Sequence, residues 1–408
     1  MSATTSFFAS CPRGLEELLQ AEVQLLNPHK IFVQKGGVEF ITTKIKALDF
    51  LLTSRLASRL FLKVHFFKIK KMEDIYEKNL KFPWDSLLNL DQTFKIQTLF
   101  DQEAKARFNN SMMSSLKLKD ALADYFRATT GERPSVNTKF PNVSLLLRVE
   151  KTRDADEFAS TLWVDLCGEA LSHRGYRPPK AYAPLRENLA AALVLSTDWK
   201  PGQEPLIDPM CGSGTLLVEA AMIALNLPPT FLKIRKRLET SRAQFSFENQ
   251  LWFLNDKFLT REFDQLIEMH YQNILEGLNT PLQFPLYGYD KDRVSLEMSR
   301  TSLKTAMIPA ELVHLEQSFA TDVHLPVEGG PGVILTNPPY GERLGEEEQL
   351  KEEYHQLGEY LKNHAQGYRA YVFTGNAELR KSISLKTSKR IPFFNGDIEC
   401  RLLKYDLY

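Results

Sequence analysis

The sequence predicts an α/β chain in which a mostly parallel sheet with helices on both faces follows smaller α+β units. In the second half, short apolar runs alternate with stretches of helical periodicity, which is typical of parallel strands joined by helical crossovers. In the first half the strand-like and helix-like segments do not alternate in this regular way, and basic residues outnumber acidic ones. At 408 residues the chain is long enough for two or three domains.

Residues 1–70 are predicted to form the first α+β unit. An opening strand precedes an amphipathic helix in "GLEELLQAEVQLL", whose leucines recur at helical spacing. Two short strands are expected around a turn at Gly36-Gly37, followed by a second helix. The β-like run "LFLKVHFFKI" closes the unit.

Residues 71–167 are predicted to form a second α+β unit with a basic surface. "TFKIQTLF" predicts a strand, and "SMMSSLKLKDALADYFRATTG" predicts an amphipathic helix that ends at Gly131, before two further strands. Residues 30–148 contain 21 Lys and Arg against 12 Asp and Glu, so this half is expected to contact a polyanion. The alternative is that the cations only solvate the surface. The candidate contact residues are Lys105, Arg107, Lys117, Lys119 and Arg127.

The α/β domain is expected to occupy residues 186–408, after a linker at 168–185 that is rich in Pro, Gly and Arg. Residues 227–284 are too long for a plain connection and are interpreted as an inserted, mostly helical element. "IPFFNGDIECRLLKYDLY" predicts a closing antiparallel hairpin around Asn395-Gly396.

Composition excludes several classes of protein. No run of about 18 apolar residues predicts a membrane-spanning helix, and the amino terminus does not resemble a secretory signal. The four cysteines are far apart and lack metal-ligand spacing, so free thiols, no metal site and a cytoplasmic location are expected. The sequence makes no prediction of oligomeric state.

The clearest cofactor signal is "LIDPMCGSGTLLVEAAMIA". A strand ends at Asp208, glycines follow, and a helix is expected to start near Thr215, the arrangement that binds ligands in doubly wound sheets. Gly212 and Gly214 allow close approach of the backbone to a ligand. The stretch lacks the Gly-Lys-Ser/Thr of a P-loop and the GxGxxG of dinucleotide enzymes. An acidic residue at the strand end suits a cationic ligand, such as a sulfonium that carries an amino acid; a tight structural turn is the alternative.

Two further carboxylates follow predicted strands. Asp290 ends "LYGYD" and could accept from both hydroxyls of a ribose, and Asp322 in "ATDVHLP" could accept from an adenine amino group. Each one alone could instead cap a loop or a helix. The fourth strand, "VILT", ends in Asn337-Pro338-Pro339-Tyr340. Two prolines cannot continue a strand, so this segment is either a stiff exit turn or a site.

The combination of motifs resembles a known family. "DPMCGSGT" followed by "NPPY" is similar to class I methyltransferases that use S-adenosylmethionine to methylate exocyclic amino groups. "FFASCPRGLEELL", "HRGYR", "APLRENLAAALV" and "NPPYGERLG" narrow the resemblance to the THUMP-domain RNA guanine-N2 methyltransferases, which include bacterial 23S rRNA enzymes. Some of these carry a second, fused methyltransferase domain, which this sequence, ending at residue 408, is expected to lack.

The resemblance implies a class I (Rossmann-like) methyltransferase domain with a seven-stranded, mostly parallel sheet, after a ferredoxin-like domain and a THUMP domain that bind RNA. It implies that Asp290 holds the ribose of S-adenosylmethionine and Asp322 its adenine. Asn188 in "APLRENLA" would flank the cofactor, although an ordinary amphipathic helix is the alternative. The methionine end would be lined by Asp208, Gly212, Ser213, Gly214 and Thr215.

The chemistry of an exocyclic amine explains "NPPY". Its lone pair is delocalised into the ring, so two acceptors that hold both N–H groups could turn the lone pair toward the methyl group. The side-chain oxygen of Asn337 and the carbonyl of Pro338 could be these acceptors, and Tyr340 could stack on the extruded base. No general base is required, and Cys211 is expected to be a small buried residue rather than a nucleophile.

The predicted function is methylation of the N2 amino group of a guanine, with 23S rRNA as the first choice of substrate. A tRNA guanine-N2 methyltransferase is the nearest alternative, since it could use the same modules. Less favoured are a DNA adenine or cytosine amino-methyltransferase, which shares "NPPY", and a protein-glutamine methyltransferase. A non-catalytic RNA-binding assembly factor is the alternative from another class.

Overall fold

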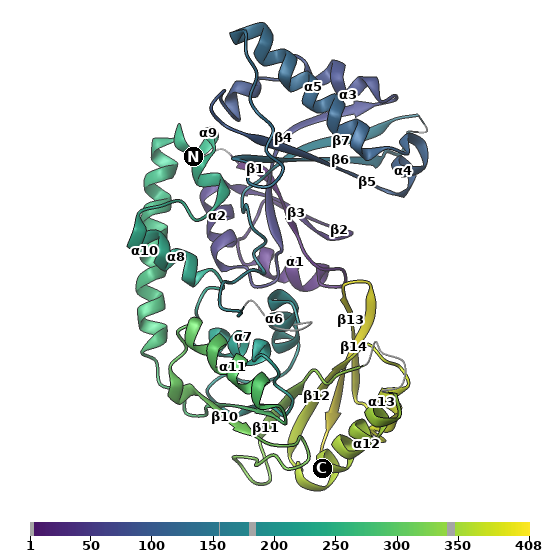
Figure 1. The fold of residues 1–408 in the computed structure, drawn as a ribbon, viewed down its shortest axis with the longest axis vertical. Coiled ribbons are helices and arrows are strands. Elements are labelled where there is room, and N and C mark those ends of the chain that lie inside the picture. The colour runs from purple at the N-terminus through teal and green to yellow at the C-terminus, as the bar shows by residue number, and fades with distance from the viewer. Residues whose placement is uncertain (1–3, 155, 179–184, 341–346) are drawn as a thin grey trace.

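The computed structural model describes residues 4–154, 156–178, 185–340 and 347–408, which form two seven-stranded sheets (Figure 1). The first sheet has the order β2-β3-β1-β4-β7-β6-β5. Its strands are β1 (Thr4–Ser10), β2 (Lys30–Gln34), β3 (Gly37–Thr43), β4 (Arg59–Ile69), β5 (Phe94–Phe100), β6 (Val143–Lys151) and β7 (Phe158–Asp165). Its helices are α1 (Glu16–Gln24), α2 (Lys44–Thr53), α3 (Glu73–Asn79), α4 (Gln102–Phe108) and α5 (Ser111–Thr130), with a 3-10 turn at Trp84–Ser86.

The two predicted α+β units share this one sheet. Strand β4 pairs with β1 through residues 59–62 and with β7 through residues 61–69, with a register shift between Lys63 and His65. The long β-like run therefore joins the two units rather than closing the first. Because the backbone hydrogen bonds are continuous across β4, the two units are expected to move as one body.

The first hairpin differs in detail from the sequence prediction. The turn consists of Lys35 and Gly36, the latter with φ +82°, while Gly37 already opens β3 and pairs with Ser10. A Cβ on Gly37 would lie 2.2 Å from the carbonyl oxygen of Ala9. The second glycine is therefore required by the close packing of β3 on β1, and only the first by the turn.

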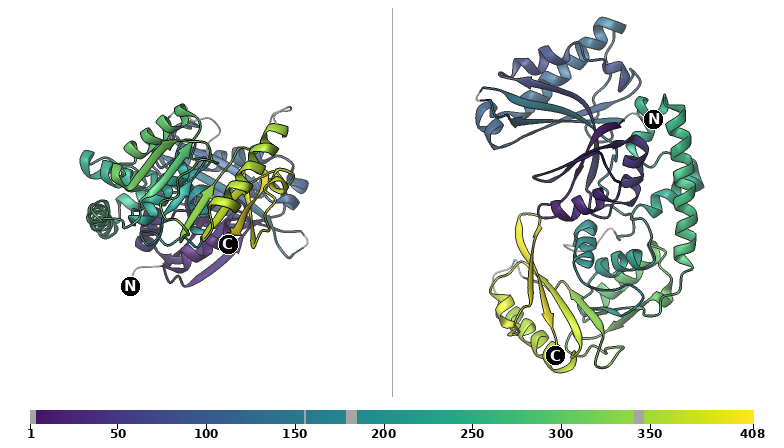
Figure 2. Two further views of the ribbon diagram at one scale, coloured as in Figure 1. Left: turned by 90° about the horizontal axis from the view of Figure 1, so that it is seen from below. Right: turned by 180° about the vertical axis from the view of Figure 1, so that it is seen from behind.

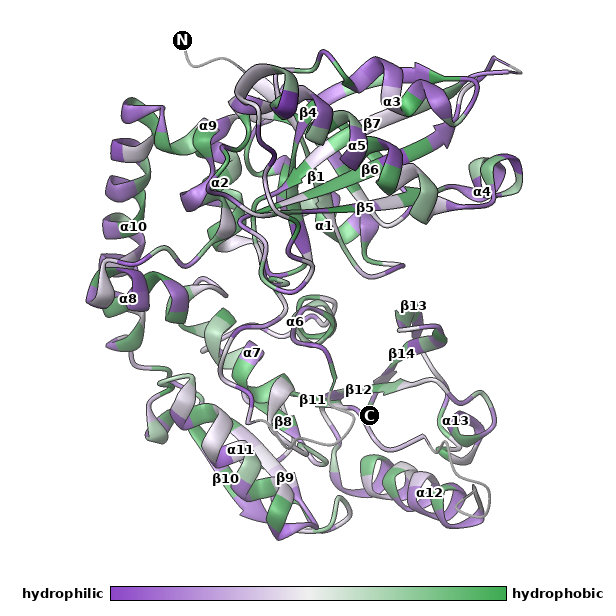
Figure 3. Ribbon diagram, turned by 45° about the horizontal axis from the view of Figure 1, so that its top comes forward, coloured by the Kyte–Doolittle hydropathy of each residue, from purple (hydrophilic) through white to green (hydrophobic). Residues whose placement is uncertain are grey.

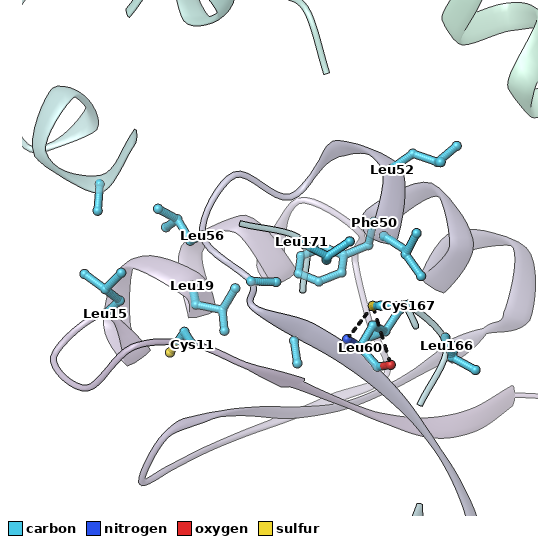
Figure 4. Close-up of a cluster of buried hydrophobic side chains, with 14 of the residues drawn as sticks. Cys11, Leu15, Leu19, Phe50, Leu52, Leu56, Leu60, Leu166, Cys167 and Leu171 are labelled. Atoms are coloured by element: carbon cyan, nitrogen blue, oxygen red, sulfur yellow. Dashed lines mark hydrogen bonds between the residues drawn. The ribbon is translucent and has the colours of Figure 1, made fainter. Parts of the chain in front are cut away.

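Helices α1 and α2 enclose a leucine-rich core against the first sheet (Figure 4). The thiol of Cys167 lies within it and accepts a hydrogen bond from the backbone N–H of Leu60 at 3.2 Å. All four cysteines are free and buried; the sequence predicted free thiols, and burial only for Cys211. Burial raises the pKa of the Cys167 thiol, so this sulfur is a packing group rather than a reactive one.

The second sheet has the order β10-β9-β8-β11-β12-β14-β13, which confirms the predicted fold class. The first five of these strands are parallel, and β14 pairs antiparallel with β12 and with β13. The strands are β8 (Leu206–Asp208), β9 (Leu286–Asp290), β10 (Val313–Gln317), β11 (Gly332–Thr336), β12 (Tyr368–Thr374), β13 (Lys389–Asn395) and β14 (Ile398–Asp406). The helices are α6 (Glu187–Leu195), α7 (Thr215–Ala224), α11 (Arg293–Thr305), α12 (Glu347–His364) and α13 (Leu379–Ser382), with a 3-10 turn at Ala310–Leu312.

Residues 227–284 form a helical brace between the two sheets. It contains α8 (Phe231–Thr240), a 3-10 turn (Ser246–Asn249), α9 (Leu251–Leu254) and α10 (Lys257–Leu278). Helix α10 runs along the side of the molecule past both parts, with its outer side hydrophilic (Figures 2 and 3). The ring Nε2 of His270 lies 2.7 Å from Asp49 of α2, and Gln250 donates to the carbonyl of Asp165 at 2.8 Å. The brace therefore contacts both halves of the first sheet.

The segment predicted as a linker is packed rather than loose, as far as it is described. The side chains of Leu171, Arg174 and Tyr176 are at most 2% exposed. Arg174 donates to the carbonyls of Leu171 and Arg55, each at 2.6 Å, and Tyr176 donates to Glu219 of α7 at 3.0 Å. The described part of this segment therefore forms a fixed contact between the two parts. No helix in the described ranges is long and apolar enough to cross a membrane.

Candidate active site

Asp208 lies at the carboxyl end of β8, in the middle of the second sheet. Its side chain is 1% exposed, and the backbone N–H of Met210 donates to it at 3.2 Å. Burial raises the pKa of Asp208 to about 7, and the nearby charge of Asp290 adds to the increase. No Lys or Arg forms an ion pair with this carboxyl group within the described residues. A cationic ligand would therefore stabilise its ionised form.

The glycine turn after β8 is held by α11 and by Asp290. The backbone N–H of Gly212 donates to Asp290 at 2.9 Å, which joins the ends of β8 and β9. Ser299 donates to the carbonyl of Gly212 at 2.6 Å, and Ser302 to that of Ser213 at 2.9 Å. Sequence reasoning missed both serines. Their signal was two small polar residues three positions apart on the buried side of a predicted helix.

The two glycines of this turn have different surroundings, although both have positive φ. A Cβ on Gly212, at φ +54°, would meet no atom within 4 Å, whereas one on Gly214, at φ +77°, would lie 3.0 Å from Oγ of Ser299. Helix α7 begins immediately afterwards at Thr215, as predicted. The space beside Gly212 is open to a ligand, and the space beside Gly214 is filled by α11.

Of the other predicted cofactor residues, Asp290 lies at the end of its strand, whereas Asp322 and Asn188 lie elsewhere. Both carboxylate oxygens of Asp290 accept backbone N–H groups, from Gly212 and from Asp292. Strand β10 ends at Gln317, so the exposed Asp322 lies five residues beyond it and not at the strand end as predicted. Asn188 is buried in α6 and donates to the carbonyl of Leu56 and to Ser58. Its described hydrogen bonds thus join the second sheet to the first.

Asn337 and Pro338 follow β11, the strand beside β8. Thr336 ends β11, and the side-chain oxygen Oδ1 of Asn337 is buried with no hydrogen-bond partner in the part of the chain that the structure describes. Pro338 is buried next to it. An unpaired buried acceptor is costly, so a ligand that donates a hydrogen bond to this oxygen would be stabilised.

Tyr340 is half-buried against the core around α12, and its hydroxyl accepts a hydrogen bond from Asn395 at 2.8 Å. It therefore connects "NPPY" to the closing hairpin. The following "GERLG" at 341–345, which contributed to the resemblance, lies outside the described residues.

The predicted RNA-binding cations lie on α4 and α5. Lys105 and Arg107 are exposed on α4 and form no ion pair within the described residues. On α5, Lys119 pairs with Asp120 and Arg127 with Asp124, each at 2.8 Å, while Lys117 is half-buried. The described residues contain no group of three or more His, Cys, Asp or Glu that could hold a metal ion.

Family models match three parts of the chain. The model described as "RMKL-like, methyltransferase domain" matches residues 174–404, the THUMP domain matches 70–153, and the RlmL ferredoxin-like domain matches 6–61. The chain is 34% identical over 413 residues to the ribosomal RNA large subunit methyltransferase K/L of Syntrophotalea carbinolica, covering 100% of this chain and 54% of that protein. It therefore spans about half the length of this relative.

A protein from Synechocystis sp. that carries a provisional name as an RNA methyltransferase is 34% identical, over 100% of this chain and 98% of that protein. Among solved structures, a predicted N6-adenine-specific DNA methylase from Listeria monocytogenes has a TM-score of 0.80 at 26% identity, covering 100% of this chain and 97% of that one. SMU.472, a methyltransferase-like fold solved with SAH, has a TM-score of 0.79 at 24% identity, covering 100% and 99%. The chain belongs to the family of RMKL-like methyltransferase domains, preceded by a ferredoxin-like domain of the RlmL type and a THUMP domain.

Proposed function

We propose that the chain is an RNA methyltransferase that uses S-adenosylmethionine to methylate the N2 amino group of a guanine, in large-subunit ribosomal RNA. The observation that carries the proposal is the buried, unpaired Oδ1 of Asn337, next to the glycine turn after β8. Such an acceptor suits an amino group that must be oriented, because it can hold one N–H while the lone pair points elsewhere.

The residues present fit the cofactor. Asp208 has a buried carboxyl group without a cationic partner among the described side chains, and Gly212 borders open space on the same edge of the sheet. Asp208, Ser213 and Thr215 would hold the methionine end, and Asp290 the ribose. The cofactor supplies an electrophilic methyl group on a sulfonium. The role of Asp322 at the adenine and of Asn188 beside the cofactor stays a proposal.

Asn337 and Pro338 would orient the amine. Oδ1 of Asn337 and the carbonyl of Pro338 accept its two N–H groups, which directs the nitrogen lone pair toward the methyl group. Transfer of the methyl group from the sulfonium would leave a neutral thioether and a positive nitrogen, and one proton of this nitrogen would pass to water. A cationic arylamine is strongly acidic, so the chain needs no general base. Tyr340 would support the base as it leaves the RNA stack.

The RNA would be held by the first sheet and its helices. Helix α4, with Lys105 and Arg107, lies on the same open side of the C-shaped molecule as the loops after β12 (Figure 1). Ribosomal RNA presents phosphates and shape, which a THUMP domain with exposed cations can bind without reading sequence.

The test is identification of the methylated nucleoside. The chain is incubated with radiolabelled S-adenosylmethionine and undermodified ribosomal RNA, transfer RNA or DNA, and the products are digested and separated. We expect label in N2-methylguanosine from ribosomal RNA. Label only in transfer RNA would support the alternative substrate, and label only in methyladenine, as the name of the Listeria protein suggests for that protein, would refute the guanine proposal. Failure to bind the cofactor in calorimetry would favour an assembly factor.

A further inference from the structure

A pocket that contains charged and polar side chains lies at the carboxyl end of β12. It has a volume of about 350 Å³ and is lined by Thr374, Gly375, Asn376, Arg380, Glu399 and Arg401, from β12, the start of α13 and β14. Nothing in the cofactor site uses these residues. A larger pocket, of about 450 Å³, lies in the brace, where its Arg237 is already bonded to Glu248 and Asp264.

The pocket lies beside the "NPPY" segment. Thr336, the last residue of β11, pairs with Val372, and β12 ends two residues later at Thr374, so the "NPPY" segment begins next to the end of β12. Thr374 in turn pairs with Arg401. With strands about 5 Å apart, the backbones at the end of β11 and at Arg401 are two strand spacings, or about 10 Å, apart. A Cβ on Gly375, a residue that borders the pocket, would lie 3.5 Å from the ring of Tyr340, so this ring packs close to one residue of the pocket.

The pocket and the proposed cofactor site lie on opposite sides of Asn337. The strand order β9-β8-β11-β12-β14 places the glycine turn and Asp290 on one side of β11 and the pocket on the other (Figure 1). Displacement at a methyl group requires the nucleophile to approach from the side opposite the leaving sulfur. The base that carries the amine therefore has to enter from the side of β12.

The side chains in the pocket match the edge of one base. Arg401 donates through Nη2 to Oε1 of Glu399, which leaves Oε2 of the carboxylate to accept from a ligand. The guanidinium of Arg380 makes no hydrogen bond or ion pair with any described residue. Guanine presents, in order along one edge, the N2 amino group, the N1–H donor and the O6 acceptor. A carboxylate can accept from N1–H and a guanidinium can donate to O6.

We propose that this pocket receives the Watson–Crick edge of the target base and selects guanine, a proposal that rests on the proposed function. With N2 at Asn337 and Pro338, Glu399 accepts from N1–H, and Arg401 with Arg380 donates to O6. Adenine is disfavoured because its ring N1 is an acceptor and its amino group occupies the position of O6, which opposes both contacts. Glu399 and Arg401 are therefore residues that determine specificity, on a strand that contributes nothing to the cofactor turn.

The test compares guanine with 2-aminopurine at the modified position of a synthetic RNA. Both bases carry the N2 amine, but 2-aminopurine lacks the N1–H and the O6. We expect the wild-type chain to favour guanine by at least about 100-fold in kcat/KM. Glu399→Ala and Arg401→Ala should each lower kcat/KM on guanine roughly 10- to 100-fold, the equivalent of one charged hydrogen bond, and change the value on 2-aminopurine little.

Matched controls are Glu378→Gln and Arg390→Ala, at exposed positions outside the pocket. These substitutions should leave the ratio of kcat/KM on guanine to kcat/KM on 2-aminopurine unchanged. Affinity for S-adenosylmethionine, measured by calorimetry, should be that of the wild type in every variant. An unchanged preference for guanine in both pocket variants would overturn the proposal. An equal loss on both bases would also overturn it, because it would show that the pocket holds the RNA backbone. Absence of N2-methylguanosine from wild-type reactions would instead refute the proposed function.

Discussion

Asp208 is a buried carboxyl group in the proposed cofactor site, and its pKa differs strongly from that of a free side chain. Burial raises its pKa from a usual value of 3.8 to about 7. Between these two values the folded chain holds a proton that the unfolded chain releases. This group therefore lowers the stability of the empty protein as pH rises from about 4 to 7. A bound cation reverses the preference, because it favours the carboxylate.

Binding of S-adenosylmethionine should accordingly strengthen with pH. We expect its Kd to fall by up to about tenfold per unit between roughly pH 5.5 and 7, and then to level off, since ionisation of Asp208 is linked to binding. Isothermal titration calorimetry in buffers of different ionisation enthalpy would measure the Kd and the released proton. Asp208→Asn should bind weakly at every pH. A wild-type Kd that stays flat across this range would contradict the assignment.

The role of Asn337 can be separated from cofactor binding by two substitutions. Asn337→Ala removes the buried acceptor and should lower kcat at least about a hundredfold, as loss of a positioned hydrogen-bonding group does elsewhere. Asn337→Asp keeps acceptor oxygens and should retain more of the rate. Single-turnover transfer to RNA measures kcat, and calorimetry should show cofactor affinity within about twofold of the wild type. Equal activity in all three proteins would remove Asn337 from the proposed role.

At the scale of an element, alanine substitutions at the two glycines before α7 can show which of them faces the ligand. Gly212→Ala adds a methyl group in open space and should cost about 1–2 kcal/mol of unfolding free energy from backbone strain alone. It should weaken cofactor binding strongly. Gly214→Ala has the same backbone strain and also contacts Ser299, so its stability loss should be larger. Chemical denaturation measures the unfolding free energy, and calorimetry measures the affinity for the cofactor. Equal losses of both quantities in the two variants would contradict the different roles of Gly212 and Gly214.

Helices α4 and α5 differ in how freely their cations can reach RNA. Lys105→Ala with Arg107→Ala removes two exposed, unpaired charges within the described structure and should reduce the slope of log K against log salt by about 1.5 to 2. Lys119→Ala with Arg127→Ala should have a smaller effect, because each charge already has an acidic neighbour. Filter binding at several salt concentrations measures the slope, with Lys257→Ala/Arg261→Ala on α10 as the control. Equal slopes in all variants would place the RNA elsewhere.

On the scale of the whole molecule, a buried charged cluster joins the two sheets. Arg174 and Glu219 have fully buried side chains 3.5 Å apart, and Arg55 donates to the carbonyl of Leu227 at 2.7 Å. Burial raises the pKa of Glu219, and the charges of Arg174 and Arg55 oppose the increase. Because Glu219 lies on α7, one turn after the start of that helix, the cluster connects the proposed cofactor site to the half that we propose binds RNA.

Arg174→Met should therefore destabilise the protein by about 3–5 kcal/mol, since it leaves the Glu219 carboxyl buried without its main cation. Urea denaturation measures the change. Arg300→Met, which breaks an exposed pair with Glu297 at 2.7 Å, should cost under about 1 kcal/mol. Arg174→Met/Glu219→Gln should recover part of the loss. A cost for Arg174→Met no larger than that for Arg300→Met would refute the cluster as a structural connection.

The sequence by itself determined the order of strands and helices, the parallel sheet, the closing hairpin and the edge where Asp208, Asp290 and Asn337 gather. These features depend on the spacing of apolar residues, on glycine turns and on the residues at strand ends, which are local properties of the chain. Only the tertiary structure decided that Asn188 and Arg174 join the two sheets, that Asp322 lies beyond its strand, and that Glu399 and Arg401 line a pocket with the end of β12. Those placements depend on packing between residues distant in sequence, which no local pattern encodes.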